Sequence, residues 1–162
     1  MISDRASKNQ MLKNHTIAIA AAVAILVSIS SLGAVAEETY TGAIAVQIVG
    51  LKDLGGKACV AVYNDADSYP DAGKHWRFVC GDIKDGKSLL VFKNVPPGAY
   101  AAFAFHDADA NGKLKKNFIG MPKEGVGASR GAKGVMGPPK FRDAKFQVGT
   151  ERKAIRIRLK YL

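Results

Sequence analysis

The stretch AIRIRLKY, residues 154–161, decides the fold class of this chain. From Ile155 onward, every second residue is apolar and the residues between are basic. The apolar members are Ile155, Ile157, Leu159 and Tyr161, and the basic members are Arg156, Arg158 and Lys160. Because successive side chains of a strand point to opposite faces, this period of two predicts a half-solvated antiparallel strand.

Five further segments carry strand patterns and are separated by turn signals. They are residues 44–48, 57–63, 75–80, 88–95 and 99–106. Segment 57–63 is apolar on both faces, which is typical of a central strand, and Asp85-Gly86 marks a tight turn. Six or more short strands without a long amphipathic helix predict an all-β fold, an antiparallel β-sandwich of about seven strands.

The start of the chain predicts export. An apolar run at 17–29, preceded by Lys13, is too short to span a bilayer unaided. Small residues follow it, with Ala34 and Ala36 in an A-x-A pattern. We therefore expect residues 1–36 to be a helical secretory signal that is cleaved after Ala36, the alternative being an uncleaved anchor. Met11 is an alternative start to Met1.

Cleavage would leave residues 37–162 as a single domain, large enough for one core. Removing three basic residues and one acidic residue with the signal lowers the net charge from +10 to +8. For an exported protein, this charge favours an anionic envelope component or an acidic protein as partner over nucleic acid. We expect a periplasmic or secreted protein that meets the membrane only through its signal before cleavage. The alternative is that the charge serves solubility alone.

Cys59 and Cys80 both lie in the predicted mature domain. An even number of cysteines in an oxidising compartment predicts a disulfide between them. The alternative is that both are small buried residues of their strands. Their separation excludes a C-x-x-C redox site.

Residues 108–140 interrupt the strand pattern with a long insertion rich in glycine and proline. Loops much longer than about 15 residues are uncommon in compact domains unless they are functional or disordered. The insertion is therefore where we expect a site.

The segment HDADANGKL, residues 106–114, begins this insertion. Asp107, Asp109 and Asn111 occupy positions 1, 3 and 5 of a loop with Gly112 at position 6, a spacing that can direct oxygen ligands at calcium. Position 12, a glutamate in an EF-hand, is Phe118. Binding would therefore be weak unless Glu124 or Asp143 contributed. The alternative is a turn in which these side chains cap their own backbone.

Catalytic groups could be drawn from His106, Asp107, Glu124 and Ser129. Their spacing matches neither a G-x-S-x-G elbow nor an H-E-x-x-H zinc motif. We leave an enzyme as an alternative and favour a protein without catalysis.

Three motifs together resemble a known family. They are VPPGAY at 95–100 leading to His106-Asp107, then NGKL at 111–114 with NFIGMPKE at 117–124, and GPPKFRDAKF at 137–146. In this order and spacing they resemble the bacterial exported family called domain of unknown function 2141, over nearly the whole mature chain. The resemblance implies an exported sandwich of the immunoglobulin or prealbumin kind, with no established activity. Lys115, where the family usually has an acidic residue, and Ala128, where it usually has an aromatic one, depart from its pattern.

We expect the insertion to pack over one end of the sandwich as a flap. It would form a shallow polar binding site from residues around the start of the insertion, with Ser129 as a further binding candidate: His106, Asp107, Asp109, Asn111 and Glu124. The leading functional hypothesis is an exported, non-catalytic binding or interaction domain of the bacterial envelope. The alternatives are an envelope enzyme acting on a small or carbohydrate-like substrate and a structural envelope domain.

Overall fold

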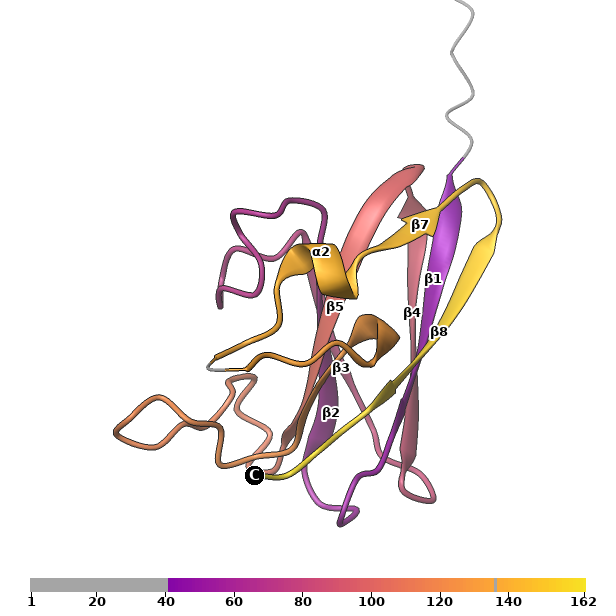
Figure 1. Ribbon diagram of the computed structural model, residues 1–162. Coiled ribbons are helices and arrows are strands. Elements are labelled where there is room, and N and C mark those ends of the chain that lie inside the picture. Colours follow the sequence, from indigo (N-terminus) through magenta and orange to yellow (C-terminus); the bar gives the residue numbers. More distant parts are fainter. Residues whose placement is uncertain (1–40, 136) are drawn as a thin grey trace, which may run out of the picture. The chain divides into compact units, whose positions relative to one another are not determined.

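The computed structural model describes residues 41–135 and 137–162, so the predicted signal, residues 1–36, lies outside the described part. Eight strands, a 3-10 turn and one short helix make up the described residues (Figure 1). In chain order they are β1 (Gly42–Val49), β2 (Lys57–Tyr63), β3 (Arg77–Gly81), β4 (Lys87–Val95), β5 (Gly98–Asp107), β6 (Val126–Ala128), η1 (Ser129–Gly131), α2 (Phe141–Ala144), β7 (Phe146–Val148) and β8 (Arg152–Arg158). The predicted all-β class is confirmed.

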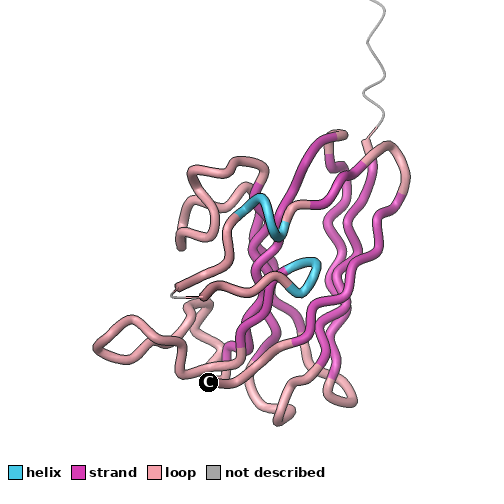
Figure 2. Tube along the Cα trace, in the orientation of Figure 1, coloured by secondary structure: helices cyan, strands magenta, loops and turns pink. Residues whose placement is uncertain are grey.

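Two sheets pack face to face as a β-sandwich (Figure 2). The smaller sheet has the order β4-β1-β8, and the larger has the order β3-β2-β5-β6 with β7 paired to the start of β5. Alternate residues of β1, β2, β4 and β5 fill the space between the sheets. They include Ile44, Val46, Ile48, Val60, Val62, Leu90, Phe92 and Ala102, all buried.

The prediction that β2 is a central strand is confirmed, because β2 is buried on both faces. One face contributes Val60 and Val62 to the core between the sheets. The other contributes Ala61 and Tyr63 to a second cluster, in which Ala128, Ala144 and the partly buried Phe141 cover the outside of the larger sheet. Both apolar faces of β2 are therefore buried, one against the smaller sheet and the other under the residues of the second cluster.

The last strand corrects one prediction. Its alternation is as expected, with Ile157 buried and Arg156 and Arg158 exposed. Its direction is not, because β8 pairs with β1 in parallel, Ala43 opposite Arg152 and Val49 opposite Arg158. The chain reaches β8 from β7 through a short crossing that delivers it beside the start of β1. A period of two reports which face is buried and carries no information on the direction of the partner strand.

Other boundaries shift slightly. The strand expected at 75–80 is β3, Arg77–Gly81, and regular pairing of the last strand ends at Arg158. The Asp85-Gly86 turn is confirmed: both residues have positive φ, and Lys84 and Lys87 exchange backbone hydrogen bonds across it.

The long insertion divides into two parts. Residues 108–123, which we call the arm, run out from the end of β5 and return to Glu124 as a loop that extends beyond the sheets (Figure 1). The second part contains β6 and η1, and it contributes Ala128 to the second cluster on the outer face of the larger sheet. Among the described residues, no helix has both the length and the apolar content needed to span a bilayer.

Candidate functional site

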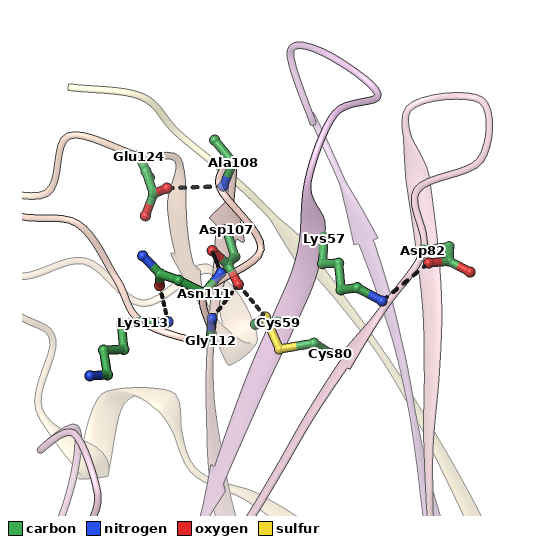
Figure 3. The surroundings of a disulfide bond; sticks show 10 residues. All are labelled: Lys57, Cys59, Cys80, Asp82, Asp107, Ala108, Asn111, Gly112, Lys113 and Glu124. Carbon is green, nitrogen blue, oxygen red and sulfur yellow. Dashed lines mark hydrogen bonds and ion pairs between the residues drawn. A yellow bond between two sulfur atoms is a disulfide. The ribbon is translucent and has the colours of Figure 1, made fainter.

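The arm begins at a buried carboxylate. Asp107, the last residue of β5, is 1% exposed. Its Oδ1 accepts a hydrogen bond from the backbone N–H of Asn111 at 3.1 Å, and its Oδ2 accepts one from Gly112 at 2.7 Å (Figure 3). Two bonds from one carboxylate to residues four and five positions ahead fix the first turn of the arm.

A second buried carboxylate joins the two ends of the arm. Glu124, 6% exposed, accepts the N–H of Ala108 at Oε1, at 2.9 Å, and the N–H of Lys115 at Oε2, at 2.8 Å. The outgoing and returning segments of the arm are also joined by a hydrogen bond from the N–H of Lys123 to the carbonyl of Lys115. Side-chain and backbone hydrogen bonds therefore both hold the two segments together at the base of the arm.

A disulfide lies beneath this base. Cys59 of β2 and Cys80 of β3 are opposite each other and are bonded. Sγ of Cys59 lies 3.8 Å from Oδ2 of Asp107, so the bridge contacts the carboxylate that fixes the first turn (Figure 3). The edge strand β3, its neighbour β2 and the end of β5, from which the arm starts, thus meet at one point.

His106 is buried at 2% exposure, and both of its ring nitrogens have partners. Nε2 lies 2.8 Å from the carbonyl oxygen of Gly55, and Nδ1 lies 3.0 Å from the hydroxyl of Tyr161. A neutral imidazole satisfies both, with Nε2–H donating to the carbonyl and Nδ1 accepting from the hydroxyl. Asp53 is near as well, with Oδ1 3.5 Å from Nε2.

Tyr161 was not among the site residues proposed from the sequence. Its hydroxyl also accepts the N–H of Lys52 at 3.1 Å, and Lys52 Nζ lies 4.4 Å from the centre of its ring. Gly125 packs flat against that ring, because a Cβ on Gly125 would lie 2.6 Å from Cζ of Tyr161. The sequence feature that reflects this contact is Gly125, directly after Glu124. It does not point to Tyr161, because the tyrosine lies 36 residues further along the chain.

Ser129 occupies a different place. It is fully buried, and its hydroxyl accepts the N–H of Ala102 at 2.9 Å and lies 2.6 Å from the carbonyl oxygen of Ala144. It therefore ties α2 to β5 on the outer face of the larger sheet. None of its hydrogen bonds involves His106 or Glu124, so these three residues are not joined in a nucleophile–base arrangement.

An acidic cluster forms at the base of the arm. One carboxylate oxygen each from Asp107, Asp109 and Glu124 lies within 4.8 Å of the others. Asn111 adopts a different role, because its Oδ1 accepts the N–H of Lys113 at 2.7 Å in an Asx turn. Each oxygen of Asp107 and Glu124 already accepts a backbone N–H, and Asp109 lies 3.9 Å from the ammonium of Lys115.

Two shallow hollows lie on another part of the surface. One is lined by Arg130, Phe146, Gln147, Lys153, Ile155 and Arg156. The other is lined by Gln47, Val49, Gly50, Gly86, Lys87, Arg156 and Arg158. Neither hollow is lined by His106, Glu124 or Ser129, which are candidate catalytic residues.

The fold and the site together define a small disulfide-bonded β-sandwich domain in which buried carboxylates shape a projecting loop. Residues 46–156 match the model of the family described as uncharacterized protein conserved in bacteria, DUF2141. The chain belongs to this family, as its motifs indicated. No curated protein and no solved structure gives a significant match.

Proposed function

We propose that this chain is an exported, non-catalytic binding domain of the bacterial envelope that contacts its partner through the arm. The observation that carries the proposal is the pair of buried carboxylates, Asp107 and Glu124, whose oxygens all bind backbone N–H groups of the arm. The two side chains therefore fix the backbone conformation of one surface loop.

Burial of carboxylates is costly unless their hydrogen bonds are satisfied. A loop that only connected β5 to β6 would not need such an arrangement, since surface loops tolerate variation in length and shape. The arm instead has a fixed base on a disulfide-linked sheet. Fixed loops on rigid scaffolds are the usual carriers of binding function.

The enzyme alternative has less support. His106 and Glu124 are fully engaged with backbone groups or with Tyr161, and Ser129 is bonded elsewhere. The purely structural alternative does not account for the apolar residues that the arm exposes at its tip, including Phe118 at 98% exposure.

Export rests on the pattern of residues 1–36 and gives the compartment in which the domain works. We expect the tagged full chain, expressed in a bacterium, to be recovered from the periplasm with Glu37 as its first residue. Recovery of the uncleaved chain in the cytosol would overturn this part of the proposal.

Binding is tested in the same cells with a photo-crosslinking amino acid in place of Lys116 or Lys123 on the arm. A matched control carries it in place of Lys93, an exposed lysine of β4. We expect crosslinks to an envelope component from both arm positions and none from position 93. Equal crosslinking from all three positions, or none from the arm, would contradict an arm-centred binding function.

A weak calcium site at the base of the arm is a subordinate proposal, favoured by the position of Glu124 beside Asp107 and Asp109. Because the oxygens of Asp107 and Glu124 already have N–H partners, we expect a dissociation constant of about 1 mM. Calcium at about 5 mM should then raise the melting temperature by roughly 3 °C. Asp109→Asn should abolish the rise, whereas Asp67→Asn, an exposed aspartate of the 64–76 connection, should preserve it. An unchanged melting temperature in the unsubstituted protein would refute the calcium site.

A further inference from the structure

The outermost part of the arm is a small closed turn, residues 117–121, which we call the apex. Asn117 organises it: its Oδ1 accepts the N–H groups of Ile119 and Met121, at 3.1 and 2.8 Å. The backbone of Asn117 bonds in turn to Met121 and Gly120. Gly120 has φ +82°, a left-handed conformation that glycine adopts without strain.

This turn exposes apolar side chains. Phe118 is 98% exposed, Ile119 67% and Met121 45%, so three large apolar residues within four positions face solvent together. Single exposed apolar residues are ordinary on protein surfaces, but a cluster of them on a preformed turn marks an interaction site. The apex is also convex, since it is the end of a projecting loop (Figure 1).

Basic residues lie immediately behind the apex. Lys116 is paired with Pro122 in the first rung of the arm, and Lys115 with Lys123 in the next. Together with Lys113 these lysines form what we call the collar, and all four are exposed. Asp109 is the exposed acidic residue of the arm, because the carboxylates of Asp107 and Glu124 are buried at its base.

We propose that the apex inserts into an anionic phospholipid surface, with Phe118 and Ile119 below the headgroups and the collar against the lipid phosphates. The inference rests on the proposed binding function and names its partner. An apolar tip with four exposed lysines behind it matches the order of layers in a bilayer, hydrocarbon beneath anionic headgroups. A protein partner would instead need a deep apolar socket with an acidic rim.

This assignment differs from the sequence-based expectation that the chain meets the membrane only through its signal. From the sequence, Phe118 was notable only because it stands where an EF-hand loop has its glutamate. The sequence pattern that indicates a contact residue is Phe-Ile-x-Met at 118–121, flanked by lysines at 115, 116 and 123.

The test is cosedimentation of the processed protein, residues 37–162, with two kinds of vesicle. One contains phosphatidylcholine alone, and the other contains phosphatidylcholine mixed with phosphatidylglycerol. We expect binding to the anionic vesicles, weakened by high salt, and little binding to the neutral ones. Phe118→Ser combined with Ile119→Ser should lower the partition coefficient about 10-fold or more. Lys116→Gln combined with Lys123→Gln should do the same through lost charge.

Leu89→Ser is the matched control, because Leu89 is also a largely exposed apolar residue, 61%, but lies on β4 outside the arm. It should bind as the unsubstituted protein does, and all variants should keep the same melting temperature since the changed side chains are exposed. Failure to bind anionic vesicles, or equal binding by the Phe118→Ser/Ile119→Ser variant, overturns the inference. If arm crosslinks to a protein persist in cells in that case, the partner is a protein and the proposed binding function stands.

Discussion

Replacing Asp107 by alanine is expected to lower the free energy of unfolding by about 3 kcal/mol. The change removes the acceptor of the N–H groups of Asn111 and Gly112, and it leaves a gap beside the buried Cys59 sulfur. Urea unfolding measures the loss of stability. Hydrogen exchange should show faster exchange at the amides of residues 111 and 112, because the first turn of the arm loses its anchor.

Two variants sharpen this experiment. Asp109→Ala is the matched control, since Asp109 is exposed and contributes only a long ion pair to Lys115, and it should change stability by less than about 0.5 kcal/mol. Asp107→Asn keeps one acceptor oxygen, so its free energy of unfolding should lie between those of the Asp107→Ala variant and the unsubstituted protein. Equal stability of the Asp107→Ala and Asp109→Ala variants would show that the buried carboxylate does not hold the arm.

Removing the disulfide by the double change Cys59→Ala and Cys80→Ala is expected to cost about 3 kcal/mol, through the greater conformational entropy of the unfolded chain. The two residues are 21 apart in the sequence, and Cys59 is fully buried. The double change avoids leaving an unpaired thiol in the core. Urea unfolding with and without a thiol reductant provides the measurement.

The reductant should destabilise the unsubstituted protein by a similar amount and leave the double variant unaffected. That comparison separates the crosslink from the effect of the smaller side chains. If reduction leaves the unfolding midpoint of the unsubstituted protein in place, the bridge does not contribute to stability.

The positions of β1 to β5 and of β8 could be predicted from the sequence because each carries its own pattern. The three-residue strands β6 and β7 are too short to show one. The alternation at 154–161 and the two-sided apolar run at 57–63 depend only on which faces are buried, and both agree with the structure. The parallel pairing of β8 with β1 could not be predicted in this way. It depends on the route of the chain from β7, which no local pattern records.

In the candidate site, too, the features set by short-range spacing could be predicted, and the contacts between residues distant in the sequence could not. The Asp107 to Gly112 turn follows from short-range spacing, and the alternative of a backbone-capping turn describes the hydrogen bonds of Asp107 and Asn111. Tyr161 was expected only as an apolar residue of the last strand, and its hydrogen bond to His106 joins residues 55 apart in the sequence, which no local pattern records. Phe118 had one, but its exposure depends on the closed turn around Asn117, which only the structure displays.

The position of β1 between β4 and β8 has a consequence for when folding can finish. Among the described residues β1 is the first strand and β8 the last, so the smaller sheet needs segments about 110 residues apart before its central strand is paired on each side. Contacts of such long sequence separation form slowly and late. Under the export proposed above, β1 would enter the translocation channel well before β8, so the smaller sheet could be completed only after both strands had crossed.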